Sequence, residues 1–301
     1  MHAMRHGELR LGTFTPSVLL DAARETGALD AAGLRVAEAP VPSSPAQFAS
    51  LEAGEYDAVL TSPDNVLAYR FLPGNPLGRL LDVEIVAALD RGLGLCLAAR
   101  PGLDRLEPGL RLAVDVPTSG FAFVGYALLA ARGLDRADCE LAVLGSTPVR
   151  ARALAAGECD VTILNASNDL AARAEGCAIV ASATELGPYL GTVLARLRTA
   201  PRAEAVDRLA DALVATAEGI RDGSLADQAT ASAERVLGLP PELAAEHTAM
   251  LRDPARGLVE GGIADRPALD ALVALRRRFL PVPELDDVDF AALVRPDRLA
   301  G

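Results

Sequence analysis

Four short segments of the chain combine hydroxyl or amide side chains with the start of an apolar, helix-like run. Backbone N–H groups at a helix start lack partners inside the helix, and the peptide dipoles add roughly half a positive charge there. Such positions suit a carboxylate, sulfonate or phosphate group. The alternative is that these hydroxyls only cap their helices, which stabilises a helix by about 1 kcal/mol whatever the function. The segments are Thr13–Ser17, Ser62–Asn65, Pro117–Phe121 and Asn165–Asn168.

We expect these segments to converge on one small-molecule site. Thr118-Ser119-Gly120 is the strongest candidate, because glycine lets a ligand approach the backbone. Phe14 and Phe121 stand in corresponding segments and could enclose an apolar part of the ligand, unless both serve core packing. The candidate ligand-binding residues are Thr13, Phe14, Thr15, Ser62, Asn65, Thr118, Ser119, Gly120, Phe121, Asn165 and Ser167.

The charged residues near these segments are few. No arginine falls inside them, which argues against a bidentate clamp on a doubly charged oxyanion. Arg91 is the one arginine expected to be able to enter the site, and a solvated turn arginine is the alternative. Asp64 and Glu185 are candidate general bases, with helix capping as their ordinary role. Asp115 and Asp169 are further acidic neighbours.

The histidines do not form a catalytic pattern. His2 and His6 stand near the start of the chain, and His247 falls in a helix expected to be peripheral. The sequence therefore predicts neither a histidine-based triad nor a metal site, and no cofactor is expected.

An internal repeat organises the first half of the chain. Leu9-Arg10-Leu11 recurs as Leu110-Arg111-Leu112, 101 positions later. The run from Leu51 to Asp57 recurs from Leu154 to Asp160, 103 positions later. Several matches in the same order indicate a duplicated unit of alternating strands and helices, which favours parallel sheets.

The expected elements follow from apolar runs and helix start signals. Two connections cross between the units, at Val83–Ala99 and Glu185–Ala195. The expected strands are Leu9–Phe14, Leu34–Ala39, Ala58–Leu60, Leu110–Val114, Leu141–Leu144, Val161–Leu164 and Tyr189–Leu194. The expected C-terminal helices are Ala203–Arg221, Ala226–Leu237, Pro241–Met250 and Arg266–Phe279.

This pattern resembles the type II periplasmic-binding-protein fold. It is most similar to the solute receptors for nitrate, sulfonate and taurine uptake and to the related thiamine-pyrimidine synthases. The runs that carry the resemblance are Leu9–Ser17, Leu51–Asn65, Leu110–Leu134 and Ala153–Ser167.

The resemblance implies an α/β clamshell of two lobes, each a mostly parallel sheet flanked by helices, joined by two crossover segments. Lobe I would comprise residues 8–89 with 190–301, and lobe II, inserted into it, residues 93–186. The ligand would bind in the cleft between the lobes. The synthase activity is not expected, because the cysteine-rich motif and the site histidine of those enzymes are missing.

Composition limits the partners. The chain has 29 basic residues, all arginine, against 41 acidic residues, which gives a net charge of −12. Nucleic acids and anionic lipids require basic patches, so neither is an expected partner. No apolar run approaches the roughly 20 residues of a membrane span. The sequence begins without a secretory leader, so a cytoplasmic location is expected unless a leader has been removed.

Two functions remain open. The first is binding of a small organic anion, such as a carboxylate or sulfonate with an apolar part, with an ABC permease as partner if the chain is exported. The alternative is a cytoplasmic enzyme on the same fold, a decarboxylase, dehydratase or other lyase acting on a small carboxylic acid through a carboxylate base in the cleft.

Overall fold

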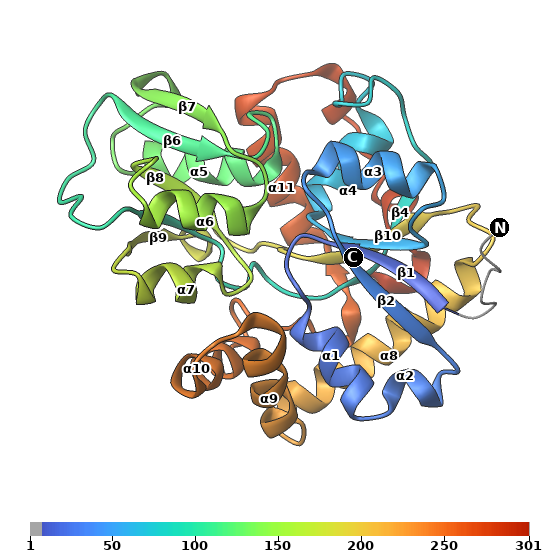
Figure 1. Ribbon diagram of the computed structural model, residues 1–301. Coiled ribbons are helices and arrows are strands. Elements are labelled where there is room, and N and C mark those ends of the chain that lie inside the picture. The colour runs from blue at the N-terminus through green and yellow to red at the C-terminus, as the bar shows by residue number, and fades with distance from the viewer. Residues whose placement is uncertain (1–7, 301) are drawn as a thin grey trace, which may run out of the picture.

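Two five-stranded sheets, each flanked by helices, lie side by side in the computed structural model, which describes residues 8–300 (Figure 1). We call the unit built on the first sheet lobe I and the unit built on the second lobe II. The first sheet has the order β2-β1-β3-β10-β4 and the second the order β7-β6-β8-β5-β9. The strands of the first sheet are β1 (Glu8–Thr13), β2 (Arg35–Pro40), β3 (Ala58–Thr61), β4 (Val83–Ala88) and β10 (Val193–Leu197). Those of the second are β5 (Cys96–Ala99), β6 (Leu110–Val114), β7 (Cys139–Val143), β8 (Val161–Leu164) and β9 (Ala178–Ser182).

Each sheet contains one reversed strand. In lobe I, β10 pairs antiparallel with both β3 and β4, while β1 pairs parallel with β2 and β3. In lobe II, β5 pairs antiparallel with β8 and β9, while β6 pairs parallel with β7 and β8. The reversed strand is in both cases the one that follows a crossing between the lobes.

Helices cover the two sheets and extend beyond them. Apolar residues recur every three or four positions along the longest helix, α8, so that one of its faces is buried against the sheet of lobe I. The helices of lobe I are α1 (Val18–Glu25), α2 (Ala28–Ala31), α3 (Ser44–Glu52), α4 (Pro63–Phe71), α8 (Ala203–Asp222), α9 (Ala226–Leu237), α10 (Pro241–Leu251), α11 (Arg266–Phe279) and α12 (Phe290–Leu293). Those of lobe II are α5 (Gly120–Ala130), α6 (Thr147–Ala155) and α7 (Asn168–Ala174).

Short elements complete the described chain. Two-residue strands β11 (Ala264–Asp265) and β12 (Leu299–Ala300) pair in parallel. Five 3-10 turns span Arg136–Asp138, Ala183–Leu186, Glu260–Gly262, Pro283–Leu285 and Pro296–Arg298. None of the helices within residues 8–300 is both long and apolar enough to cross a membrane.

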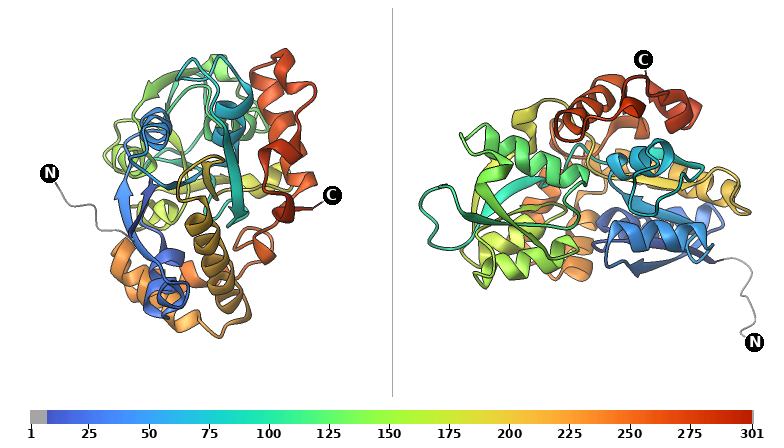
Figure 2. Two further views of the ribbon diagram at one scale, coloured as in Figure 1. Left: turned by 90° about the vertical axis from the view of Figure 1, so that its right-hand side faces the viewer. Right: turned by 90° about the horizontal axis from the view of Figure 1, so that it is seen from above.

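Several C-terminal helices lie away from the sheet of lobe I. Helices α9 and α10 lie beneath α7 of lobe II, and α11 runs behind the junction between the lobes (Figures 1 and 2). Helix α11 packs against α5, which belongs to lobe II. The C-terminal part of the chain therefore touches both lobes.

The sequence repeat corresponds to one structural contact made twice. In lobe I, the Asp57 carboxylate accepts a hydrogen bond of 2.8 Å from the backbone N–H of Arg10. In lobe II, the Asp160 carboxylate accepts one of 2.8 Å from the backbone N–H of Arg111. Both aspartates follow the glycine that ends a helix, and each ties that turn to the strand with which the sequence repeat begins, β1 or β6. The repeated residues therefore have equivalent structural roles.

Two connections between the lobes run side by side, and we call this pair of segments the hinge. Gly191 donates its N–H to the carbonyl of Asp90 at 2.9 Å, and Leu89 donates to the carbonyl of Thr192 at 2.8 Å. A Cβ atom at Gly191 would lie 2.2 Å from Asp90 Oδ1, so only glycine allows this approach. Burial raises the pKa of the Asp90 carboxyl.

Most expected elements are present. Helices α9 and α11 have the expected bounds, and Val83–Ala99 contains two strands, β4 and β5, one in each sheet. Strand β10 begins at Val193 rather than Tyr189, because the residues from Tyr189 to Thr192 pack into the hinge. Strand β9 was not expected, because its sequence does not alternate clearly between apolar and polar residues. In the structure this strand is partly exposed.

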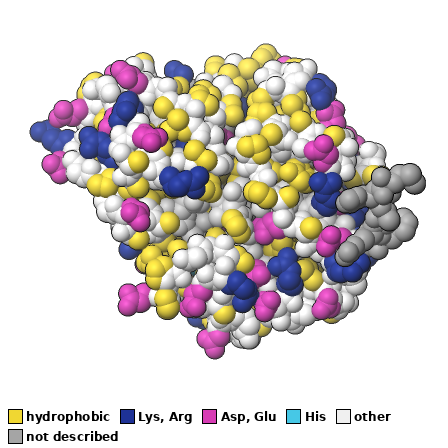
Figure 3. All heavy atoms as spheres, viewed as in Figure 1, with side chains coloured by type: hydrophobic (Ala, Val, Ile, Leu, Met, Phe, Trp, Pro, Cys, Tyr) yellow, Lys and Arg dark blue, Asp and Glu magenta, His cyan; other side chains and the backbone are white. Residues whose placement is uncertain are grey.

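On the face shown in Figure 3, acidic and arginine side chains alternate and do not gather in a patch of one sign.

Candidate functional site

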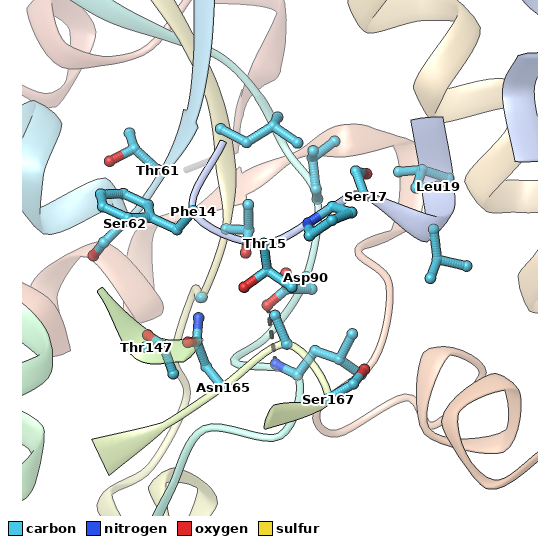
Figure 4. Close-up of a pocket in the computed structure, with 18 of the residues that line it drawn as sticks. Phe14, Thr15, Ser17, Leu19, Thr61, Ser62, Asp90, Thr147, Asn165 and Ser167 are labelled. Carbon is cyan, nitrogen blue, oxygen red and sulfur yellow. Dashed lines mark hydrogen bonds between the residues drawn. The ribbon is translucent and has the colours of Figure 1, made fainter. Parts of the chain in front are cut away.

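A cavity of about 120 Å³ lies between the lobes, beside the hinge. Lobe I contributes the segment after β1, the start of α4 and residues of α9 and α10, and lobe II contributes the segment after β8 and the start of α6. In Figure 4, Thr147, Asn165 and Ser167 lie on one side of this cavity, and Phe14, Thr15 and Ser62 lie on the other. One water takes roughly 10–15 Å³ by this measure, so the cavity has room for a small organic molecule.

Many of the residues expected in a ligand site line this cavity: Phe14, Thr15, Ser62, Asn65, Phe121, Asn165 and Ser167. Ser62 also caps α4 through an N–H···Oγ bond of 3.3 Å from Asp64. The Asn65 amide donates to Thr61 Oγ1 at 3.0 Å. Capping and cavity lining therefore occur together, and the structure brings three of the four expected segments and the end of the fourth to one place.

The other expected ligand residues lie elsewhere. Thr13 is buried outside the lining of the cavity, and its side chain interacts with Glu38, whose pKa is raised by burial. Thr118 and Ser119 line a neighbouring cavity of about 170 Å³. Ser119 caps α5 at 3.2 Å and donates its hydroxyl to Asp115 at 2.7 Å. Gly120 packs directly against Asp64.

Neither candidate general base lines the cavity beside the hinge. Asp64 is buried and forms a bidentate ion pair with Arg276, at 2.7 Å to Nε and 2.5 Å to Nη2. Glu185 is exposed, caps a 3-10 turn and pairs with Arg132 at 3.1 Å. The Ser182 N–H and the Arg132 guanidinium lower the pKa of the Glu185 carboxyl. Both carboxylates thus have structural partners.

Arg150 is the cation of the cavity, and the sequence analysis did not select it. It lies in α6, is 2 % exposed, and lines the cavity. Its Nε donates to Thr162 Oγ1 at 3.2 Å, and its Nη2 donates to Thr147 Oγ1 and to the Ile163 carbonyl, both at 3.1 Å. Its Nη1 donates to the Gly145 carbonyl.

Every acceptor of Arg150 is a neutral oxygen. Within residues 8–300, no carboxylate lies within ion-pair distance of its guanidinium. Four of its five N–H groups have these protein acceptors, which leaves one on Nη1. Burial lowers the pKa of Arg150, and the nearby Asp115 carboxylate opposes this shift. Arginine keeps its charge even when buried, so the cavity holds a positive charge with no bonded counter-ion.

The sequence repeat places a neutral side chain at the equivalent position of lobe I. Gln47, 103 positions earlier, occupies the equivalent place in α3 and is also fully buried. Its amide donates to the Leu60 carbonyl at 3.0 Å, and Leu60 is the repeat counterpart of Ile163. A neutral glutamine therefore makes in lobe I the contact that Arg150 makes in lobe II.

Two sequence predictions are corrected here. Arg91 was the one arginine expected to be able to enter the cleft, with a solvated turn arginine as the alternative, but its Nη1 bonds Asp265 at 2.8 Å, and Arg150 lines the cavity instead. His247 was expected to be peripheral, but it is 2 % exposed and lines the cavity from α10. His2 and His6 lie outside the described residues.

A signal in the sequence could have found both missed residues. Arg150 stands three positions after Thr147 and four before Leu154, which places it on the buried face of its helix. His247 stands between Ala244 and Leu251 with the same spacing. A charged or polar residue at a position of a helix where apolar residues are expected is predicted to be buried, and a buried polar residue indicates a specific role.

One part of the cavity wall is apolar. It comes mainly from lobe I and includes Leu19, Leu60, Leu89, Leu237, Leu251 and Leu258. Together with Phe14 and Phe121, these side chains give the cavity one charged region and one apolar region.

Comparison with solved structures identifies the architecture. The alkanesulfonate-binding protein SsuA of Xanthomonas axonopodis pv. citri, bound to MOPS, aligns over 99% of both chains with a TM-score of 0.73 and 19% identity. The periplasmic nitrate-binding protein NrtA of Synechocystis PCC 6803 aligns over 97% of this chain and 87% of its own, with a TM-score of 0.76 and 13% identity.

This chain has the periplasmic-binding-protein fold. The periplasmic aliphatic sulphonate binding protein SsuA of Escherichia coli shares this fold, with a TM-score of 0.69 and 18% identity over 97% of this chain and 98% of its own. No family model matches the sequence, and no curated protein matches it. At these identities the comparison establishes the periplasmic-binding-protein fold and leaves the ligand to be argued from the cavity.

Proposed function

We propose that this chain binds a small organic anion between its lobes. The observation that carries the proposal is Arg150, a buried guanidinium that faces the cavity without a carboxylate partner. Burying an unpaired charge is costly, and a ligand anion would offset that cost when it binds. The glutamine at the equivalent place in lobe I supports a functional reason for the charge, because a neutral side chain suffices there.

The rest of the cavity points to the shape of the ligand. Thr147 and Asn165 surround the charged region with hydroxyl and amide groups. The leucines of lobe I, with Phe14 and Phe121 from the two lobes, would contact an apolar part. A carboxylate or sulfonate with a short hydrocarbon chain satisfies both regions, whereas Asp115 and Asp90 in the same lining disfavour a second negative charge.

The structural neighbours support a transport role. They include proteins named as binding alkanesulfonate and nitrate, and one described as the ligand-binding component of an ABC-type import system. On this proposal the chain delivers its ligand to an ABC permease. The moving parts would be lobe I, residues 8–89 with 190–301, and lobe II, residues 93–186, about the hinge at Asp90 and Gly191.

The compartment stays a prediction. The Escherichia coli and Synechocystis neighbours are named as periplasmic proteins. Service to an import permease would require export, and fractionation of cells that express the natural gene measures this directly.

Isothermal titration with butanesulfonate, hexanoate and the uncharged hexanamide tests the proposed ligand class. We expect the two anions to bind and hexanamide to bind more weakly. The test variant is Arg150→Gln, which installs the side chain found at the equivalent place in lobe I. A hydrogen bond to a charged group is worth about 1.5–3 kcal/mol, so affinity for the anions should fall roughly 10- to 100-fold.

Arg152→Gln is the matched control, because Arg152 lies in the same helix, is exposed, and its loss changes the net charge equally. The proposal is wrong if Arg150→Gln binds the anions as tightly as Arg152→Gln. It is also wrong if hexanamide binds the unmodified chain as tightly as hexanoate does.

A further inference from the structure

A buried hydrogen bond between two lobes links Ser167 to His247. Ser167 directly precedes α7 of lobe II. His247 lies in α10 of lobe I, which comes after the last strand of that lobe's sheet in the chain. Ser167 Oγ and His247 Nδ1 are 2.5 Å apart, and the two residues are 3 % and 2 % exposed. Ser167 makes no side-chain capping bond to α7. Its hydroxyl bonds His247 instead, and the residue lines the cavity.

The backbone that presents Ser167 is strained. Ala166 and Ser167 have φ values of +50° and +71°, and they are the two non-glycine residues with positive φ in the described chain. Residues with a Cβ atom rarely adopt this conformation, and it persists where surrounding contacts hold it. The strained turn directs the Ser167 side chain across the cleft toward α10.

The other polar contacts between α7 and lobe I are more exposed. Arg173 of α7 and Glu246 of α10 form an ion pair at 2.5 Å, with side chains 44% and 39% exposed. Exposed ion pairs of this kind contribute little to stability. The Asn168 amide reaches Thr15 Oγ1 at 3.3 Å. Ser167 and His247 therefore form the buried polar contact of this interface.

His247 is neutral where it lies. Burial lowers its pKa to about 4, because the imidazolium cannot be hydrated there. The charged groups around it are Asp169 and Arg173 of α7, Glu246 of α10, Asp90 of the hinge, and Asp115 and Arg150 across the cavity. Separation of the lobes would expose the imidazole and return its pKa toward about 6.5.

We propose that Ser167 and His247 form a latch that holds the lobes together, and that protonation of His247 opens it. The consequence for the ligand rests on the proposed function, because an opened cleft releases what it holds. The latch itself is a property of the two lobes and is testable without ligand.

The direction in which pH shifts the balance between closed and open forms distinguishes the titration of His247 from that of its acidic neighbours. A base with a lower pKa in the closed form binds fewer protons there, so acid favours the open form. Each pH unit below about 6.5 then lowers the ratio of closed to open protein by up to tenfold, down to the closed-form pKa of about 4. Burial raises the pKa of Asp169 to about 6 and that of Asp90 as well, so acid favours their buried state.

Small-angle X-ray scattering of the full chain measures the opening. We expect the radius of gyration to rise as the pH falls from about 7.5 to about 5. In His247→Gln, which keeps a side chain able to bond Ser167 but gains no proton, this rise should be lost. Asp169→Asn is the matched control for a second titrating group, and it should still open in acid. The proposal is overturned if the unmodified chain does not expand in acid, or if His247→Gln expands equally.

Ser167→Gly provides a second measurement that does not depend on the histidine variant. Glycine adopts a φ of +71° without strain, so this variant removes the hydroxyl and not the turn. It should be more open than the unmodified chain at about pH 7.5, and equal radii of gyration would contradict the latch.

Titration with butanesulfonate at the same two pH values adds the ligand. Affinity should fall at least several-fold in acid for the unmodified chain and change less for His247→Gln. Absence of any binding would refute the proposed function alone, while the scattering experiment would still decide the latch.

Discussion

The ion pair between Asp64 and Arg276 predicts a large loss of stability when one partner is neutralised. The two side chains are 1% and 4% exposed and meet through two hydrogen bonds. Asp64→Asn keeps the shape but leaves the guanidinium without its counter-charge. Breaking a buried pair from one side costs about 3–5 kcal/mol, because the remaining charge stays buried.

The exposed pair between Glu52 and Arg79 gives the matched comparison, since its side chains are 34% and 54% exposed. Glu52→Gln removes the same charge and should cost at most about 1 kcal/mol. Urea unfolding at neutral pH measures both variants. Arg276→Met added to Asp64→Asn should recover part of the loss, because an apolar side chain needs no counter-charge. Equal costs for Asp64→Asn and Glu52→Gln, or no recovery in the double variant, would refute the reasoning.

Two more substitutions test the packing and the titration of single groups. Gly120→Ala should destabilise the chain by about 1–3 kcal/mol in thermal melts, because its Cβ would lie 2.4 Å from Asp64 Cβ. Gly74→Ala, in open space, is the control, and a stabilised Gly120→Ala would contradict the contact. Asp169→Asn should stabilise the chain at neutral pH by up to about 3 kcal/mol, since burial raises the Asp169 pKa from 3.8 to about 6. A raised carboxyl pKa penalises folding above about pH 6 and not below about pH 4, so an equal gain at both pH values would exclude this cause.

The sequence predicts the architecture well because the repeat and the apolar periods are local signals. The duplicated turn at Asp57 and Asp160 forms the same contact in both lobes, and α9 and α11 have the expected bounds. The cavity is less predictable, because it depends on which helix face meets the other lobe. Loop residues such as Asn165 were found from helix start signals, whereas Arg150 and His247 lie inside helices.

The charge of Arg150 is a difference between the two copies of the repeat. Comparing the two units residue by residue places Arg150 opposite a glutamine, and that difference is visible in the sequence alone. The pairing of Arg91 with Asp265 depends instead on a contact 174 residues apart, which no local pattern indicates.

The reversed strand of the first sheet also governs the order in which the lobes can fold during synthesis. All five strands of the second sheet lie between Cys96 and Ser182, so this sheet can close as soon as that stretch has left the ribosome. In the first sheet, β10 lies between β3 and β4, and β4 pairs with no other strand among the described residues. The growing chain must therefore hold β4 unpaired until Val193–Leu197 arrives, so the lobe that begins first is completed last.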